Sequence, residues 1–542
     1  METTEVIIVG AGPAGLSLAV ALGMQKVKSI ILEKNLEICE DPRAIAIAGD
    51  TARIINVLGI NPNKIGQSMP AIHFHRSAFT SKPFLSIDHE RDWLEQALPP
   101  TAVFFQPQLE KELRALVEAS EYAELRLEST VISISDMSKS VQVTYSSKEG
   151  SSIELQGNYL VGADGKRGFV RKEYLEAFGI KQQPGFFCSL SAMPVAAGRF
   201  GPKHEKYWRF EYELPPNFIP SDPHKHLEEQ MKAHMTIAGK ELSFSQQVVN
   251  RWFHENVMLI GDAAHVFPPF GAQGIASGLR DALGLSWRLS LLCNPRLRAN
   301  FPASRDALLH GWSRERRKGV DDSSILTAGN GSLLLSKSKL LVSVLNIASG
   351  ALEYLPRFRD WLVNRYVDDR DGYRGVQEGF FLERQGGGIK TAQVCVKTNN
   401  GFVQLSDDVF NGHGGFLTLL LLGQSSDKEV LALEEALADA KLPPYLLSDD
   451  VVELCDGVPS SKSTSPATSK IKKLYLGTPE DTVRLVGDTL VPLYTPAPFR
   501  GRFQPSTRFA LIRPDLVVFS QAEGLDQLMS QLDTALKMIE RI

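Results

Sequence analysis

The feature that most constrains the fold of this chain is a glycine-rich turn near its N-terminus. The turn occupies residues 10–15, reads GAGPAG, and directly follows the short apolar run 5–9. An Ala- and Leu-rich helix over 16–22 and a second apolar strand over 29–32 come next, with Glu33 at the end of that strand. This order predicts a parallel β-α-β unit of the kind that binds dinucleotides, and therefore an α/β fold with a Rossmann-like domain.

The residues of this turn suit a phosphate-binding role for separate reasons. Gly10 allows the tight turn, Gly12 lets the backbone approach a pyrophosphate, and Gly15 lets the helix pack closely on the strand. The N-terminus of the predicted helix supplies unpaired N–H groups and a positive dipole end for the phosphates. A glycine-rich turn without a ligand is the alternative interpretation.

Two further acidic residues stand where strands end. Glu33 follows Gly15 by 18 residues, and a carboxylate there suits the ribose hydroxyls of an adenosine while disfavouring a 2′-phosphate. Residues 160–171 read as a strand, a turn at Asp164-Gly165 and a helix. Taken alone, Asp164 and Gly165 are also typical of an ordinary turn.

A second long motif identifies the dinucleotide more closely. The apolar strand 257–260 ends in Gly261-Asp262, and a carboxylate at that point can accept hydrogen bonds from the ribityl hydroxyls of a flavin. The small residues of the stretch 271–274 let the backbone pass close to a flat ring. A helix beginning near Ile275 directs its positive end toward that ring, where it stabilises the negative charge of a reduced flavin. Together, the two motifs predict an FAD site.

Size, charge and cysteine content set the wider limits. A chain of 542 residues is too long for one core, so two to four domains are expected. The net charge of −4 gives no reason to expect nucleic acid or an anionic membrane as a partner. Five scattered cysteines without a CxxC pair predict neither disulfides nor a metal site. The longest apolar stretch, 340–355, is interrupted by polar residues, so we expect no membrane span and a cytoplasmic protein.

The remaining pattern suggests how the chain is divided. A helix is predicted over 106–119 and a strand pair over 125–146, whereas 275–292 and 303–370 read as mostly helical. The stretch 185–215 is rich in β-type residues and is our candidate for a substrate-covering sheet. A change in composition near residue 380 marks a domain boundary. Beyond it, we expect strands over 416–422, 510–512 and 516–519, with helices over 429–440 and 525–539.

With these motifs assembled, the chain resembles the single-component FAD-dependent aromatic hydroxylases, the family of p-hydroxybenzoate hydroxylase and phenol hydroxylase. The resemblance is nearest to 3-(3-hydroxyphenyl)propionate hydroxylase and to phenol hydroxylase-like members. The three glycine motifs occur in the family's order, and further similar segments lie at 41–45, 106–113, 277–282 and 314–317. The segments 484–488 and 511–515 resemble the C-terminal domain of the longer members.

The resemblance implies a particular domain organisation. It predicts a discontinuous FAD-binding domain of the p-hydroxybenzoate hydroxylase type, an inserted β-sheet domain for the substrate, a helical connector and a thioredoxin-like α/β domain. The ranges are, in that order, 1–72, 96–184 and 255–345; 73–95 and 185–254; 346–380; and 381–542. Without a CxxC pair, the thioredoxin-like domain is expected to serve structure or oligomerisation. A homodimer is one arrangement that it allows.

The family also implies roles for individual residues. Arg43 and Gln106 are expected to touch the flavin or its ribityl chain, and Pro269 to lie near the reactive C4a edge. Gly168 stands where the family usually has Ser, and Ala276 where it often has Asn. The predicted cofactor contacts are Gly10, Gly12, Pro13, Ala14, Gly15, Glu33, Lys34, Arg43, Gln106, Val131, Asp164, Gly165, Gly261, Asp262, Pro269, Gly271, Gly274, Ile275 and Ala276.

The implied reaction is a monooxygenation. NADPH or NADH reduces FAD, O2 adds at C4a, and the hydroperoxide transfers an oxygen atom to a phenolic or other electron-rich aromatic substrate. The protein must exclude water, orient the small aromatic substrate and help to deprotonate its hydroxyl group. Tyr207 and Tyr212 lie on the predicted substrate sheet. The residues predicted for catalysis or for the pocket are Arg43, Asp50, Tyr207, Tyr212 and Pro269, with His73, His75 and Arg209 as further candidates.

Other functions remain open on the sequence alone. The same fold supports alkene epoxidation, Baeyer–Villiger oxidation or a plain reduction, and a non-catalytic flavin-binding scaffold is a second class. The residues do not identify the substrate, because no single residue of the expected pocket segments dictates a particular ring. They do not decide between NADH and NADPH, because no dedicated nicotinamide domain is visible.

Overall fold

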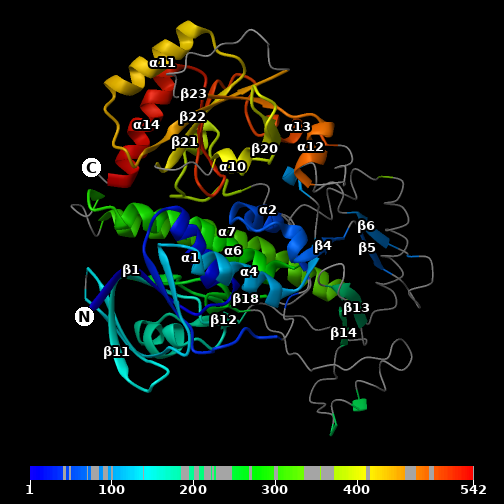
Figure 1. Ribbon diagram of the computed structural model, residues 1–542, viewed down its shortest axis with the longest axis vertical. Helices are drawn as coiled ribbons and strands as arrows, with labels where there is room; N and C mark the ends of the chain where they lie inside the picture. The colour runs from blue at the N-terminus through cyan, green and yellow to red at the C-terminus, as the bar shows by residue number, and fades with distance from the viewer. Residues whose placement is uncertain are drawn as a thin grey trace.

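The computed structural model of the chain is a mixed α/β structure in which a layer of helices lies between two sheets (Figure 1). The N-terminal sheet lies on one side of the helices, and the C-terminal sheet lies on the other. The structure describes residues 1–40, 44, 46–47, 50–69, 71–74, 83, 85–88, 95–98, 102–137, 139–184, 195–200, 207–212, 221–222, 225–226, 247–267, 272–297, 303–334, 355, 372–410, 415–457, 471–486 and 494–540.

The N-terminal sheet has eight strands around a parallel centre. Strand β1 pairs in parallel with β2 on one side and with β11 on the other, so that Ile7 lies opposite both Ile30 and Leu160. Burial from Val6 to Val9 explains the unbroken apolar run, as is usual in a central parallel strand. The strands are β1 (Glu2–Val9), β2 (Ser29–Leu32), β8 (Ala123–Arg126), β9 (Thr130–Asp136), β10 (Val141–Ser146), β11 (Ser152–Gly162), β16 (Phe253–His254) and β17 (Val257–Leu259).

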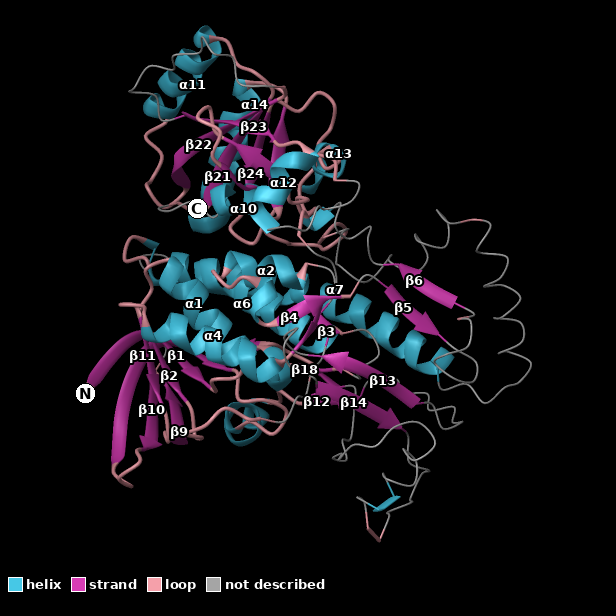
Figure 2. Cartoon of the chain, turned by 45° about the vertical axis from the view of Figure 1, so that its right-hand side comes forward, coloured by secondary structure: helices cyan, strands magenta, loops and turns pink. Residues whose placement is uncertain are grey.

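The helix layer covers one face of this sheet and carries the glycine motifs. Helix α1 begins at Pro13, within the glycine motif, and the order β1, α1, β2 confirms the predicted strand–helix–strand unit. Figure 2 shows α1, α2, α4, α6 and α7 between the N-terminal sheet and the C-terminal domain. The helices are α1 (Pro13–Met24), α2 (Thr51–Val57), α4 (Gln106–Glu118), α6 (Gln273–Cys293) and α7 (Ala303–Leu334). The predicted helices over 106–119 and 275–292 are thus confirmed, as is the first part of 303–370.

Several small sheets lie at the far end of the helix layer. The hairpins β5–β6 and β13–β14 stand beside the tip of α7 in Figure 2, and β14 falls on the predicted strand that contains Tyr207. The first part of the predicted sheet, over 185–194, lies outside the described residues. The small strands are β3 (Ala46–Ile47), β4 (Gly66–Ser68), β5 (Ala71–Phe74), β6 (Leu85–Asp88), β7 (Ala102–Phe104), β12 (Gln182–Pro184), β13 (Val195–Phe200), β14 (Tyr207–Tyr212), β15 (Gln247–Val249) and β18 (His265–Val266).

The C-terminal domain contains a seven-stranded mixed sheet in the order β20-β19-β23-β22-β21-β24-β25. The strands are β19 (Cys395–Lys397), β20 (Val403–Leu405), β21 (Leu417–Leu422), β22 (Leu447–Cys455), β23 (Ile471–Leu476), β24 (Phe509–Ile512) and β25 (Val518–Ala522). The helices are α10 (Ser406–Phe410), α11 (Asp427–Asp439), α12 (Pro479–Val486), α13 (Ala497–Arg500) and α14 (Leu525–Glu540). A capping box, in which Ser426 and Glu429 bond each other's backbone N–H, starts α11.

One predicted strand of this domain is displaced. The apolar run 516–519 was expected to be a strand, but β25 begins only at Val518. Leu516 has a φ of +64° and donates its N–H to the carbonyl of Arg513, so this residue closes a turn instead. The two strands β24 and β25 therefore form a hairpin around the turn.

The described parts of the chain contain no helix that is long and apolar enough to cross a membrane. Of the cysteines in those parts, Cys293, Cys395 and Cys455 are buried, Cys39 is exposed, and all four are free thiols.

Candidate cofactor site

The glycine turn is shaped by close backbone approaches at two of its three glycines. Gly10 has a φ of +105°, and a Cβ atom there would lie 2.5 Å from the carbonyl oxygen of Ala163. A Cβ atom on Gly15 would collide with the carbonyl oxygen of Gly10. At Gly12, in contrast, the position of a Cβ atom is open. Because α1 begins at Pro13 without a side-chain cap, its first N–H groups adjoin this open space, as a pyrophosphate requires.

Glu33 is fixed against the same turn. One carboxylate oxygen accepts a hydrogen bond of 2.8 Å from the N–H of Ala11, and the other accepts two from Asn35. Glu33 is therefore buried and oriented toward the start of α1, whereas its neighbour Lys34 is exposed. Val131 lies buried on β9. The structure thus places the Glu33 carboxylate directly beside the glycine turn.

Glu33 offers a direct test of the adenosine end. Replacing Glu33 with glutamine is expected to weaken FAD binding by about tenfold, the equivalent of one charge-assisted hydrogen bond. The dissociation constant can be measured by titrating apoprotein with FAD and following flavin fluorescence. The exposed neighbour Glu37, changed to glutamine, serves as the control and is expected to leave the constant unchanged. Equal constants for E33Q and the wild type would remove Glu33 from the site.

The two long motifs, distant in the sequence, meet at Ala14. A Cβ atom on Gly261 would lie 2.9 Å from that of Ala14, and one on Gly278 would lie 3.2 Å from it. Gly261, with a φ of +58°, and Gly278 thus allow the second motif and helix α6 to approach the first turn of α1. The N-terminal parts of α1 and α6 are therefore close together. This arrangement suits a flavin dinucleotide, which has a pyrophosphate and a ring that becomes negative on reduction.

Asp281 of α6 holds the second motif in place from inside the protein. Its Oδ2 accepts hydrogen bonds from the N–H of Gly261 (2.9 Å) and from Nε2 of His265 (2.6 Å). Its Oδ1 accepts one of 2.8 Å from Nε of Arg316 on α7. Burial opposes the ionisation of Asp281, but the attraction of His265 and Arg316 outweighs it and lowers the pKa of this carboxyl. Asp262, next to Gly261, is exposed, as a ligand for ribityl hydroxyls must be.

The start of α6 has no side-chain cap. The residue before the helix, Ala272, has a φ of +56° and supplies none. Gly274 and Ile275 are partly exposed, Ala276 is buried, and a Cβ atom on Gly274 would meet no described residue within 4 Å. An uncapped helix N-terminus agrees with the role expected toward reduced flavin.

Gln106 joins α4 to the segment that precedes Asp50. Its Oε1 accepts a hydrogen bond of 3.2 Å from the N–H of Ala44, and its Nε2 donates one of 2.8 Å to Glu110. The first of these hydrogen bonds fixes Gln106 against Ala44. The predicted flavin contacts Arg43, Pro269 and Gly271 lie outside the described residues.

The Asp164-Gly165 turn is stabilised by its own backbone. Asp164 accepts a hydrogen bond of 2.9 Å from the N–H of Val170, and Gly165 has a φ of +80°. Burial raises the pKa of Asp164 to about 6, although backbone hydrogen bonds partly oppose this change. Arg171 donates to the carbonyl of Lys166 at 2.6 Å, which places it against this loop. The helix expected after this turn is irregular, beginning with one π-helical turn over Val170–Tyr174.

Gly168, which stands where the family usually has Ser, is required by the position of Asp164. A Cβ atom on Gly168 would collide with the Asp164 carboxylate. We expect Gly168→Ser to displace that carboxylate and to lower the free energy of unfolding by about 1–3 kcal/mol, as overpacking typically does. Urea unfolding measures the change, with Gly524→Ser as the control because its Cβ position is open. An unchanged midpoint for G168S would contradict this account of the loop.

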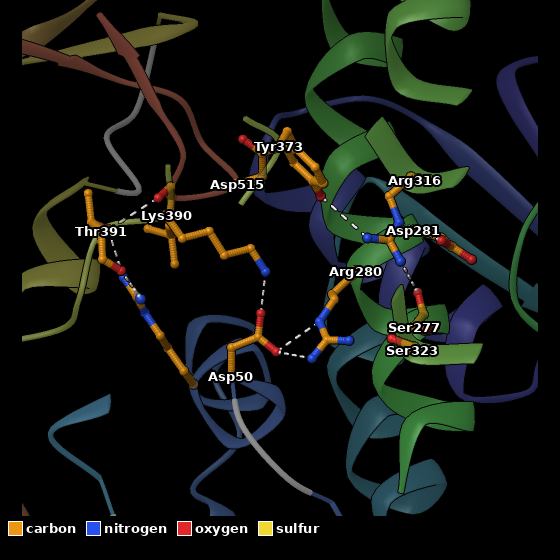
Figure 3. Close-up of polar contacts among 12 residues, drawn as sticks. Asp50, Ser277, Arg280, Asp281, Arg316, Ser323, Tyr373, Lys390, Thr391 and Asp515 are labelled. Atoms are coloured by element: carbon orange, nitrogen blue, oxygen red, sulfur yellow. Dashed lines mark hydrogen bonds and ion pairs between the residues drawn. The ribbon is translucent and has the colours of Figure 1, made fainter. Parts of the chain in front are cut away.

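Asp50, predicted as a pocket residue, is buried between two cations (Figure 3). Its Oδ1 accepts hydrogen bonds from Nε (2.9 Å) and Nη2 (2.6 Å) of Arg280, and its Oδ2 accepts one from Nζ of Lys390. Burial disfavours the charged form, but Arg280 and Lys390 together outweigh it and hold the pKa of Asp50 far below its usual range. Sequence reasoning noted Arg280 and Asp281 only as family similarities and did not identify Lys390.

The other predicted pocket residues are only partly described. Tyr207 and Tyr212 lie at the two ends of β14, opposite Phe200 and Val195 of β13. Arg209 lies on the same strand, opposite Gly198. His73 on β5 is exposed, and its Nδ1 lies 2.9 Å from the hydroxyl of Ser86 on β6. His75 lies outside the described residues.

These features are typical of a flavin-dinucleotide-binding protein. They are the β1–α1–β2 unit, the start of α6 near α1, and Asp281, which holds the second motif from inside the protein. The family described as "FAD binding domain" matches residues 3–210 and 214–316, which is more than half of the chain. The chain therefore belongs to this family, and FAD is its cofactor.

Curated relatives and solved structures agree with this family. A probable NADH-specific resorcinol 4-hydroxylase of Rhodococcus jostii is 28% identical over 352 residues, which are 59% of this chain and 63% of the relative. A 3-(3-hydroxy-phenyl)propionate/3-hydroxycinnamic acid hydroxylase of Escherichia coli is 25% identical over 453 residues, 76% of this chain and 77% of the relative. The match thus spans less than two thirds of the resorcinol hydroxylase.

The fold is shared with a crystal structure of the flavin-dependent monooxygenase PieE in complex with FAD and substrate. The TM-score is 0.71 at 16% identity, with 100% of this chain and 99% of that chain covered. The similarity therefore extends over the C-terminal domain as well as the FAD-binding part.

Proposed function

We propose that the protein is an FAD-dependent monooxygenase that uses NADH or NADPH and O2 to hydroxylate a phenolic or other electron-rich aromatic compound. The observation that carries the proposal is the meeting of both glycine motifs at Ala14, in a chain whose curated relatives are named aromatic hydroxylases. Bound FAD supplies the redox chemistry of such a reaction. NADH and NADPH are both cytoplasmic reductants, and we infer that the protein works in that compartment.

The described residues fit FAD along its length. Gly12 and the first turn of α1 would hold the pyrophosphate, and Glu33 would hold the adenosine ribose. Asp262 would bind the ribityl hydroxyls, and the start of α6 would face the pyrimidine edge of the flavin. A helix N-terminus there stabilises negative charge on the reduced ring, which is the state that reacts with O2.

For the substrate, we propose a position between the start of α6 and the hairpins β5–β6 and β13–β14. Strands β6, β13 and β14 fall within the expected substrate ranges 73–95 and 185–254, and β5 overlaps the start of the first range. Both hairpins lie beside the helix layer in Figure 2. Arg43, Pro269, Tyr207 and Tyr212 stay in this proposed site. Asp50 is proposed to act by holding its two cations, because a carboxylate whose pKa is strongly lowered is a weak base near neutral pH.

We further propose that the C-terminal domain, over about 381–542, is thioredoxin-like in fold but has no redox role. Its mixed sheet with α11 and α14 supports the fold. Burial raises the pKa of Cys395 to about 12 and that of Cys455 to about 11, so neither thiol ionises readily near neutral pH. Thiol–disulfide exchange needs a thiolate, and these two cysteines therefore lack the reactivity of a redox pair.

Oxygen uptake tests the proposed reaction against the alternatives. The holoprotein is mixed with NADH or NADPH and a panel of phenols, and both reductant oxidation and O2 consumption are recorded. We expect at least one phenol to raise both rates together. Reductant oxidation without O2 uptake would identify a reductase instead, and a yellow protein that no combination reduces would identify a flavin-binding scaffold.

A further inference from the structure

The C-terminal domain contributes a buried lysine to the surroundings of the cofactor site. Lys390 lies on the segment before β19, where its backbone forms an isolated β-bridge with Val517. Its side chain is buried, and its ammonium group donates a hydrogen bond to Oδ2 of Asp50, which precedes α2. The neighbouring Arg53 of α2 makes a second contact with the same domain, through Asp407. Two separate ion pairs therefore connect α2 and the residue before it with the C-terminal domain, and one of them is made by Lys390.

From Asp50, the contacts continue to the start of α6. Arg280 donates to Oδ1 of Asp50 through Nε and Nη2, and its Nη1 donates to Oε1 of Gln273 at 3.0 Å. Gln273 is the first residue of α6, next to Gly274. Buried hydrogen bonds therefore connect Lys390 of the C-terminal domain with the helix turn assigned to the flavin. Figure 3 shows Lys390 and Arg280 on opposite sides of the Asp50 carboxylate.

Two cations share one carboxylate in this group. Among the described contacts, Lys390 and Arg280 both bind the carboxylate of Asp50, so Lys390 brings a positive charge to this buried place. The adjacent pair Arg53–Asp407 is balanced. Arg316 of α7 is likewise paired with Asp281. A buried positive charge acts over a longer range than an exposed one, because the interior screens it less than water does.

We propose that Lys390 is a positioning residue through which the C-terminal domain completes the cofactor site, fixing the first turn of α6 through Asp50 and Arg280 and adding the positive charge that favours reduced, anionic flavin. The inference rests on FAD binding, which family membership shows, and not on the hydroxylase activity. The thioredoxin-like domain is then part of the flavin environment as well as a structural attachment.

The flavin midpoint potential of the holoprotein tests this proposal, since the potential should follow the net charge of the group. Lys390→Met removes one positive charge, and we expect the potential to become more negative. Asp50→Asn removes the negative charge, and we expect a shift in the positive direction. The double variant D50N/K390M regains the original net charge, so its potential should return toward that of the wild type. Lys390→Arg keeps the charge and should behave like the wild type.

A matched control separates charge from stability. Lys397 forms a partly buried ion pair with Asp481 entirely within the C-terminal domain, and Lys397→Met should leave the potential unchanged. The FAD affinity of K390M is expected to fall by about tenfold. The variant loses the charge-assisted hydrogen bond between Lys390 and Asp50, through which Lys390 helps to position the start of α6. Unchanged potentials in folded, FAD-bound K390M and D50N would overturn the proposal. If K390M fails to fold, the sign of the shift in D50N alone decides. None of these measurements depends on hydroxylation.

Discussion

Replacing Glu315 with glutamine is expected to lower the free energy of unfolding by about 3–5 kcal/mol, the usual effect of breaking a buried ion pair. Glu315 lies on α7, and its buried carboxylate accepts hydrogen bonds from Arg288 of α6 (2.7 Å) and from both terminal nitrogens of Arg513 (2.9 Å each). It also accepts one from the N–H of Phe380 at 2.7 Å. The variant removes the carboxylate that Arg288 and Arg513 share, and both guanidinium groups remain buried between the helix layer and the C-terminal domain.

The same group predicts how stability depends on pH. Burial would raise the pKa of Glu315, but Arg288 and Arg513 outweigh it and lower the pKa to about 2 from an ordinary value of 4.5. The folded state therefore binds its proton at lower pH than the unfolded state does. Its contribution, about 3 kcal/mol by linkage, is complete above pH 4.5 and is lost as the pH falls through about 2. E315Q should lack this part of the acid dependence.

Urea unfolding at several pH values measures both effects, and the chain offers a matched control. Arg314, next to Glu315, forms an exposed ion pair with Glu378 between the same two regions. Glu378→Gln is expected to change stability by less than about 1 kcal/mol, because surface ion pairs contribute little. If E315Q and E378Q lost similar amounts of stability, the interface would not depend on its buried charges.

Replacing Asp281 with alanine is expected to remove FAD from the purified protein as well as to destabilise the fold. The buried carboxylate of Asp281 is the shared acceptor for Gly261, His265 and Arg316. Its removal takes away the described counter-ion of the Arg316 guanidinium, at about 3–5 kcal/mol, and frees the loop that carries Asp262. If about half of this free energy is lost from FAD binding because the loop is no longer held in place, FAD affinity falls by at least about tenfold.

Two measurements separate these consequences for D281A. Absorbance of the purified protein gives the FAD content, and titration of apoprotein gives the dissociation constant. Asp306→Asn serves as the control, because Asp306 is half-exposed on α7 and pairs only with its neighbour Arg305 among the contacts described for its carboxylate. A D281A protein that retains FAD at wild-type affinity would show that the second motif does not depend on Asp281.

Local patterns predicted the parts of this structure that local chemistry determines. The glycine turn requires Gly10 and Gly15 because a side chain at either position would collide with a backbone carbonyl group. The turn and its flanking strands could therefore be predicted from the sequence. Helix α4 followed from its apolar spacing, and the hairpin β9–β10 from its alternation. The strand β25 was misplaced because the apolar residue Leu516 lies in a turn, which hydrophobicity alone does not reveal.

Long-range ion pairs were not predictable in the same way. The contact between Asp50 and Lys390 spans 340 positions, and neither residue lies in a periodic pattern that would indicate its partner. Arg280 and Asp281 were visible as similar to a family, yet their roles depend on which face of α6 meets Asp50 and which meets Gly261. Such pairing is a property of the tertiary arrangement, and only the folded chain shows it.

The most direct test of the proposed function follows the oxygen atom. The holoprotein, NADH or NADPH and a phenol that stimulates O2 uptake are incubated under isotopically labelled O2, and the product is analysed by mass spectrometry. The account predicts a hydroxylated aromatic product that carries one labelled oxygen atom from O2. A product without the label, or reductant oxidation that yields only hydrogen peroxide with every aromatic compound tested, would contradict it.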